Sequence, residues 1–254
     1  MAQFDSLRQT GVGVSAEIDA GLRAHMNKVY GLMSVAMVIT GLIAYVVGMD
    51  FRAVVNNQPT TIFPADLIVT MFNSPLRWVI MFAPLAFVFG LSMGINRLSA
   101  ATAQMLFYVF AGVMGLSIAW IFAVFTGMSI AQIFFATAIM FASISIYGYT
   151  TKKDLSGWGS FLFMGLIGIV VASIINIFIG SPALMFAISA IGVLVFAGLT
   201  AYDTQRLKNE YLYYATQQGG ETWVEKSAIM GALSLYLNFI NMFMMLLQLF
   251  GSRE

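Results

Sequence analysis

Seven long apolar segments constrain this chain most strongly, and the only charge within them is Arg77 at the edge of the second. A helix needs about 20 apolar residues to cross the hydrocarbon of a bilayer. The segments run approximately over residues 29–49, 76–95, 104–126, 130–149, 158–179, 183–202 and 229–250. They predict an all-α integral membrane protein with seven transmembrane helices.

Composition excludes several other classes of protein. Only 9% of the 254 residues are charged, against about 25% in soluble domains, so the outer surface is expected to contact the lipid bilayer. The chain has no cysteine and one histidine, which excludes Cys-ligated and multi-His metal sites. A net charge of +1 without a long basic run indicates no nucleic-acid partner. We expect no cofactor.

The apolar segments leave no room for a second domain. We expect a cytoplasmic N-terminal segment over residues 1–27 and a single transmembrane domain over residues 28–254. With the N-terminus inside, nine of the 12 Lys and Arg residues fall on the cytoplasmic side and three, Arg52, Arg77 and Arg253, fall outside. The positive-inside rule therefore predicts a cytoplasmic N-terminus and an external C-terminus.

One carboxylate stands where an apolar segment ends. Asp203 follows Tyr202 at the cytoplasmic end of the sixth segment. Charged groups at membrane depth are costly and often functional. Asp203 is either part of an ion pathway or an interfacial carboxylate paired with Arg206 three residues later. Tyr202 is then part of the same pathway or an interfacial aromatic residue.

The seventh segment carries a polar stripe. Ser234, Asn238, Asn241 and Gln248 recur at spacings that place them on one face of a helix. Such a stripe faces the bundle interior, because an amide facing lipid lacks partners. It is either a set of interhelical hydrogen bonds or the lining of a permeation route, in which Asn238 and Asp203 could meet.

Arg97 lies between the second and third segments, in the string Gly-Ile-Asn-Arg-Leu-Ser. It is either a positive-inside anchor or a cationic partner for Asp203.

Three stretches of the sequence resemble the signature stretches of the Bax inhibitor family, in its bacterial inner-membrane branch. They are Leu-Thr-Ala-Tyr-Asp-Thr-Gln at 199–205, Ala-Leu-Ser-Leu-Tyr-Leu-Asn-Phe-Ile-Asn at 232–241, and Tyr-Gly-Tyr-Thr-Thr-Lys-Lys-Asp-Leu-Ser at 147–156. The resemblance implies six helices surrounding a central seventh, and a pH-sensitive calcium leak governed by two aspartates. The first aspartate matches Asp203, and an arginine that latches the closed pore matches Arg97.

The family's second aspartate belongs at the position of Asn238, where this chain departs from the pattern. Two neighbouring carboxylates share a proton and respond to pH, whereas asparagine cannot ionise. We therefore expect an altered pH response. Calcium prefers 6–8 oxygen ligands, so a single carboxylate, Asp203, suits weak and transient binding. Other cations are further candidates for the permeant ion.

Two other functional classes compete with a cation leak. A non-conducting regulator would bind quality-control or stress-response membrane proteins, with residues 209–227 as a docking segment. An intramembrane protease is disfavoured because the seventh segment has no second Asp, and because His25 precedes the first segment. We expect no enzymatic activity.

Overall fold

The computed structural model describes residues 2–215 and 221–253, and the regular structure in these ranges is helical. The helices are α1 (Ala2–Val55), α2 (Ala65–Asn73), α3 (Leu76–Gly94), α4 (Ala100–Ile118), α5 (Ile121–Val124), α6 (Gly127–Thr150), α7 (Gly159–Ile179), α8 (Pro182–Tyr214) and α9 (Glu221–Phe250). A single 3-10 turn, Ser156–Trp158, precedes α7.

Within the described ranges, seven helical spans are long and apolar enough to cross a membrane. Each coincides with one apolar segment of the sequence, and α4 and α5 together form the third span. The prediction of seven transmembrane helices is therefore confirmed. Helix α8 begins as its sequence indicates, since the Ser181 hydroxyl accepts a hydrogen bond from the Leu184 amide and Pro182 occupies the first turn.

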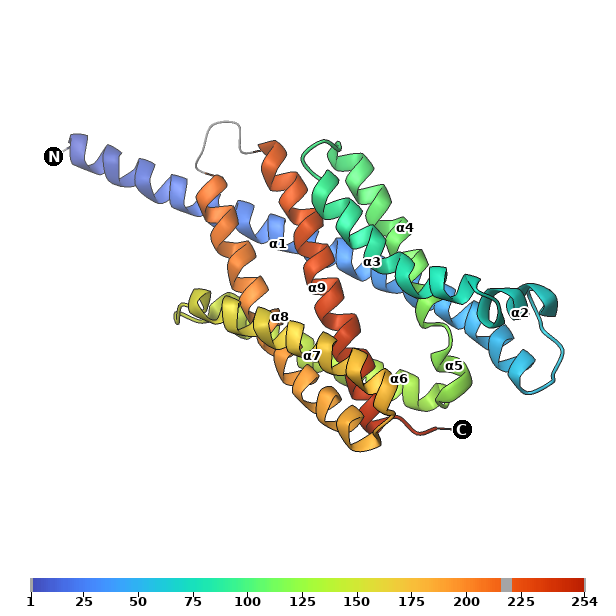
Figure 1. Cartoon of the computed structure of the whole chain (residues 1–254). Helices are drawn as coiled ribbons and strands as arrows, with labels where there is room; N and C mark the ends of the chain where they lie inside the picture. The colour runs from blue at the N-terminus through green and yellow to red at the C-terminus, as the bar shows by residue number, and fades with distance from the viewer. Residues whose placement is uncertain (1, 216–220, 254) are drawn as a thin grey trace.

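Helix α9 is the most buried span. In its apolar stretch 61% of the residues are buried, compared with at most 44% in the apolar stretches of the other six spans. It packs against α1, α4, α6 and α8 (Figure 1). Helix α3 packs mainly on α4, and α7 packs mainly on α8. Helix α9 thus contacts four other helices, and the arrangement of six helices around it stays a prediction.

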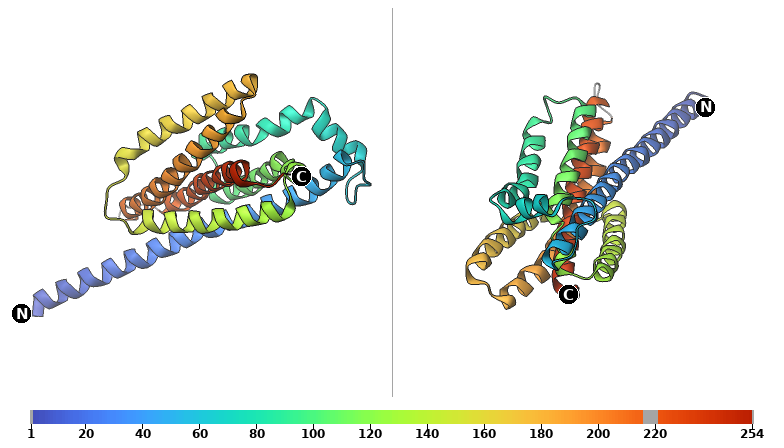
Figure 2. Two further views of the ribbon diagram at one scale, coloured as in Figure 1. Left: turned by 90° about the horizontal axis from the view of Figure 1, so that it is seen from below. Right: turned by 90° about the vertical axis from the view of Figure 1, so that its right-hand side faces the viewer.

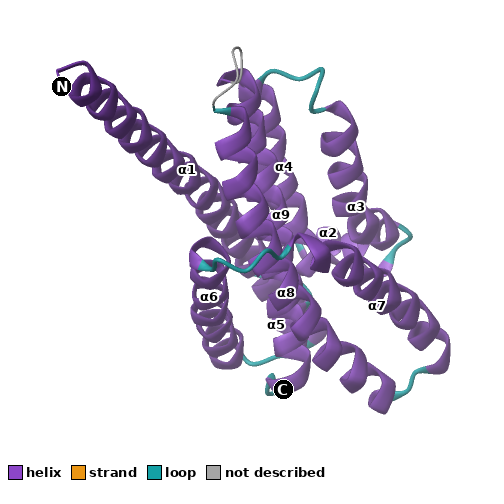
Figure 3. Cartoon of the chain, turned by 90° about the vertical axis from the view of Figure 1, so that its left-hand side faces the viewer, coloured by secondary structure: helices purple, strands orange, loops and turns teal. Residues whose placement is uncertain are grey.

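Several helices extend beyond the apolar segments that define them. Helix α1 continues toward its N-terminus as a long rod that leaves the bundle (Figures 2 and 3). The boundary that we place between residues 27 and 28 therefore lies inside a continuous helix, and the cytoplasmic location of residues 1–27 stays a prediction. Of the expected docking segment 209–227, residues 216–220 lie outside the described residues.

Two glycines allow helices to approach closely. A Cβ atom at Gly115 of α4 would lie 2.6 Å from the carbonyl oxygen of Thr40 on α1. A Cβ atom at Gly148 of α6 would collide with the carbonyl oxygen of Ala201 on α8. Small residues of this kind let membrane helices pack backbone against backbone. The Gly148 contact fixes α6 against the part of α8 that carries Asp203.

Replacing Gly148 with alanine should therefore destabilise the bundle. The added methyl group meets backbone rather than a mobile side chain, so we expect a loss of about 1–3 kcal/mol in the free energy of unfolding. Thermal unfolding of the detergent-solubilised protein measures it. Gly168→Ala on α7 is the control, because a Cβ atom there meets nothing within 4 Å. Equal melting temperatures for the two variants would contradict the close α6–α8 contact.

Candidate ion-pathway site

Helices α8 and α9 bring Asp203 together with two residues of the polar stripe, Ser234 and Asn238. The Oδ2 atom of Asp203 accepts hydrogen bonds from Ser234 Oγ and from Asn238 Nδ2, both at 2.8 Å. Ser234 and Asn238 are four residues apart and share one face of α9. Asp203 and Asn238 are each only 5% exposed. The structure thus places the carboxylate at a buried contact between the two helices.

The second oxygen of Asp203 faces a cation from its own helix. Arg206 Nη2 lies 3.1 Å from Asp203 Oδ1, and Arg206 Nε lies 3.7 Å from Glu210 Oε1. The side chain of Arg206 is 40% exposed, whereas that of Asp203 is 7% exposed. Asp203 is therefore paired with Arg206, as the interfacial interpretation predicts, but it is buried. Both of its oxygens have partners within the chain.

Two cavities meet beside this ion pair. The larger, of about 530 Å³, reaches from Asp203, Ser234 and Asn238 between α7, α8 and α9. The smaller, of about 340 Å³, is lined mainly by polar residues from Gln205 to Tyr214 of α8. Tyr202 and Arg206 line both cavities. These two side chains therefore stand at the junction between the space around Asp203 and the space beside the polar end of α8.

Tyr202 has a close-fitting environment. A Cβ atom at Gly159 would lie 2.7 Å from the Tyr202 ring carbon Cζ, so the glycine makes room for the ring. The guanidinium of Arg206 lies 5.9 Å from the ring centroid, within the range of a cation–π interaction. Tyr202 thus supports the position of Arg206 at the junction.

Not every residue of the predicted site contacts Asp203. Asn241 lines the larger cavity, but its amide donates to the Leu237 carbonyl of its own helix at 2.8 Å. Arg97 is exposed in the turn between α3 and α4, where its backbone amide bonds to the Gly94 carbonyl. The cation that contacts Asp203 is Arg206. A latching role for Arg97 stays a prediction.

The donor set around Asp203 does not form a closed metal site. Among the described residues, no group of three or more His, Asp and Glu side chains lies close enough to hold a metal ion. Ser234 and Asn238 point hydrogen atoms at Asp203. Rotation of the Asn238 amide by half a turn would present its carbonyl oxygen instead. The oxygen atoms of this arrangement therefore come from one carboxylate, one hydroxyl and one amide.

A second buried carboxylate, Asp50, has a different role that the sequence does not reveal. It is 1% exposed, and its two oxygens accept four hydrogen bonds of 2.7–3.0 Å from Thr61, Ile62 and Phe63. These bonds tie the loop before α2 to the end of α1. Three of the four donors are backbone amides, and no residue pattern marks them. Asp50 is therefore a structural anchor, and Asp203 is the buried carboxylate that faces a cavity.

The hydrogen bond from Asn238 to Asp203 should stabilise the fold more than the hydrogen bond from Asn241 to Leu237 does. In Asn238→Ala, a buried carboxylate loses a donor, so we expect a loss of about 1–3 kcal/mol in the free energy of unfolding. In Asn241→Ala, only a bond to the same helix is lost, and we expect about 0.5 kcal/mol or less. Thermal unfolding in detergent compares the two. A larger loss for Asn241→Ala would show that the Asp203–Asn238 contact is misassigned.

The chain is similar to bacterial membrane proteins over nearly its whole length. Residues 22–254 match the family described as inhibitor of apoptosis-promoting Bax1. The chain is 44% identical to the inner membrane protein YbhL of Escherichia coli K12 over 235 residues, which cover 92% of this chain and 94% of YbhL. It is 41% identical to protein RP147 of Rickettsia prowazekii over 236 residues, which cover 93% of this chain and 92% of RP147. The resemblance carried by the Tyr202-Asp203 and Asn238 strings is thereby confirmed, and the chain belongs to the Bax inhibitor family of membrane proteins.

Proposed function

We propose that the protein is a cation leak of the bacterial inner membrane, with calcium as its permeant ion and Asp203 as the group that the ion meets on its way. One observation carries the proposal. A buried carboxylate lies beside a cavity of about 530 Å³ in a seven-helix membrane bundle, and Arg206 stands between that cavity and a second, polar one.

The chemistry of Asp203 suits transit rather than storage. A cation that leaves water needs oxygen ligands, and calcium takes 6–8 of them. Asp203 supplies the charge, while Ser234 and Asn238 supply neutral oxygens once their hydrogen atoms turn away. Conduction requires binding weak enough for the ion to leave. A single carboxylate among neutral groups meets this requirement, so Asp203 acts as a transient ligand.

Arg206 closes the pathway in this arrangement. Its guanidinium lies 3.1 Å from Asp203, where a permeating cation would bind, and like charges in a partly buried site repel strongly. Displacement of Arg206 toward Glu210 would free the Asp203 carboxylate. Arg206 is therefore the gate of the proposed pathway, and Tyr202 is the residue that positions it.

Asn238 alters the pH response. In a pair of carboxylates, one shared proton determines whether the pair repels itself or forms a hydrogen bond. Asn238 donates a hydrogen bond to Asp203 as a protonated carboxyl would, but it cannot lose its proton. The proposed leak therefore favours the closed arrangement and lacks the response to pH that a second aspartate would give.

We place the Asp203–Arg206 end of α8 on the cytoplasmic side. The similarity to an inner membrane protein and the excess of Lys and Arg on that side support this placement. The N-terminus is then cytoplasmic and the C-terminus external.

A non-conducting regulator is the second candidate, and one observation favours it. Both oxygens of Asp203 are occupied by partners from the chain itself, which is also the arrangement expected of a purely structural carboxylate. Such a regulator would bind membrane proteins of quality control or stress response. It would give no cation flux above that of empty liposomes.

The two charges of the ion pair should have opposite effects on flux. In calcium-loaded proteoliposomes, we expect Arg206→Gln to raise calcium flux several-fold, because it removes the gating cation. Asp203→Ala should reduce the flux to that of empty liposomes, because it removes the charged ligand. Lys208→Gln is the control, since Lys208 bonds to the Tyr149 carbonyl and lines neither cavity. Flux equal to that of empty liposomes in every variant would favour the regulator.

Restoring the second carboxylate should restore a pH response. We expect the parent protein to show nearly constant calcium flux between about pH 5 and pH 8, and Asn238→Asp to show a change of several-fold within that range. The same proteoliposome assay measures both, with Asn241→Asp as the control for an added carboxylate that is not paired with Asp203. A parent protein with a strong pH response, unchanged in Asn238→Asp, would refute the role of Asn238.

A further inference from the structure

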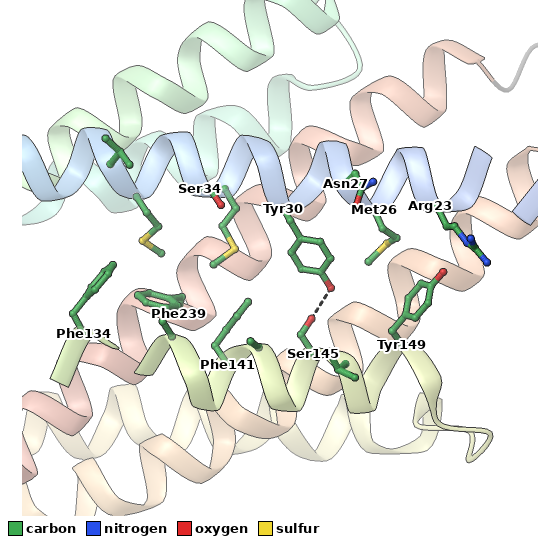
Figure 4. A pocket seen from close by; sticks show the side chains of 16 residues that line it. Arg23, Met26, Asn27, Tyr30, Ser34, Phe134, Phe141, Ser145, Tyr149 and Phe239 are labelled. Atoms are coloured by element: carbon green, nitrogen blue, oxygen red, sulfur yellow. Dashed lines mark hydrogen bonds between the residues drawn. The ribbon is translucent and has the colours of Figure 1, made fainter. Parts of the chain in front are cut away.

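A long apolar groove separates α1 from α6, on a different side of α9 from the Asp203 cavity. Two adjoining cavities of about 720 and 620 Å³ form it, and they share Met37, Val38 and Phe134. Phe239 and Ile240 of α9 contribute to its wall. Figure 4 shows side chains of α1 and α6 facing one another across the first of these cavities. Volumes of this size are typical of ligand sites.

Polar groups gather at one end of the groove. Arg23 and Asn27 of α1 and Tyr149 of α6 lie together at the end of the first cavity (Figure 4). At the far end of the second cavity, the lining includes Arg52 of α1. Arg23 and Arg52 are 29 residues apart on one continuous helix, or about 44 Å at 1.5 Å per residue. A bilayer including its headgroups is about 40–45 Å thick. The separation of the two arginines along α1 therefore matches the thickness of a bilayer with its headgroups.

A hydrogen bond crosses the groove and limits its width. Tyr30 Oη and Ser145 Oγ lie 2.6 Å apart, and Ser145 Oγ continues to Thr204 Oγ1 at 3.0 Å. Tyr30 is seven residues from Arg23, or about 10 Å deeper along the helix, where the polar interface gives way to hydrocarbon. A helix from another chain is about 10–12 Å across. Since side chains of α1 and α6 bond directly to each other here, the groove has no room for a helix at this point, and a flexible acyl chain is the better-fitting occupant.

We propose that this groove is a binding site for an anionic phospholipid of the inner leaflet. One acyl chain lies between α1 and α6 against Met37, Phe134 and Phe239, and the phosphate lies at Arg23. A guanidinium binds phosphate through paired hydrogen bonds, and the Asn27 amide and the Tyr149 hydroxyl add further donors. Basic pockets between transmembrane helices on the cytoplasmic side commonly take such headgroups. The site does not depend on whether the protein conducts ions.

Native mass spectrometry of the full chain in detergent tests the proposal. Dioleoyl phosphatidylglycerol is the probe, and dioleoylglycerol, which has the same acyl chains but no phosphoglycerol headgroup, is the comparison lipid. We expect Arg23→Gln to reduce retained phosphatidylglycerol several-fold, while Lys28→Gln, an exposed cation outside the groove lining, leaves it unchanged. Ala142→Trp fills the groove and should reduce retention of both lipids. Ala136→Trp, on the exposed face of α6 outside the groove, should not. Equal retention in all four variants would overturn the proposal.

A second measurement does not depend on a bulky substitution. Because the chain has no cysteine, Ser34→Cys places a single thiol in the groove, and Val35→Cys places one on the neighbouring exposed position. Phosphatidylglycerol should slow maleimide labelling of Ser34→Cys several-fold and leave Val35→Cys unaffected. Equal labelling rates with and without the lipid would overturn the proposal. A disulfide-linked dimer of Ser34→Cys would also overturn it, because a second copy would then occupy the groove.

Discussion

Burial of the Asp203 carboxylate within a membrane bundle is the constraint on which the site depends. An unpaired charge in such a place is costly, so the protein must supply donors at the same depth. Ser234 and Asn238 supply two from α9, and Arg206 supplies the third from α8 itself. This requirement accounts for Ser234 and Asn238 on α9, which is also the most buried span. A helix with polar groups at membrane depth is stable only among other helices.

The bundle differs on the two sides of α9. Toward α8, contacts are close, and Gly148 lets the backbone of α6 reach α8 next to the carboxylate. Helices α1 and α6 are separated by an apolar groove, which the hydrogen bond between Tyr30 and Ser145 crosses. The close α6–α8 contact holds the helix that carries Asp203, whereas the groove between α1 and α6 leaves room for lipid. Ser145 of α6 connects the two regions, because its hydroxyl contacts both Tyr30 in the groove and Thr204, the neighbour of Asp203.

Much of the architecture could be predicted from the sequence, because bilayer thickness and the cost of buried charge leave few alternatives. The seven spans and the contact of Asp203 with Asn238 were accessible in this way. The partner cation was harder to predict, because the sequence offers both Arg97 and Arg206 as partners of Asp203 and only the tertiary structure shows that Arg206 makes the contact. The backbone donors to Asp50 and the groove beside α1 depend on tertiary packing, which no local pattern encodes.

In the proposed leak, Arg206 blocks a pathway in which Asp203 is the charged ligand. The decisive measurement is calcium flux through proteoliposomes of the double variant Asp203→Ala/Arg206→Gln. If the pathway passes Asp203, removal of its carboxylate abolishes the extra flux that Arg206→Gln alone produces, and the double variant matches empty liposomes. If the double variant conducts as well as Arg206→Gln alone, ion passage does not depend on Asp203 and the proposed pathway is wrong.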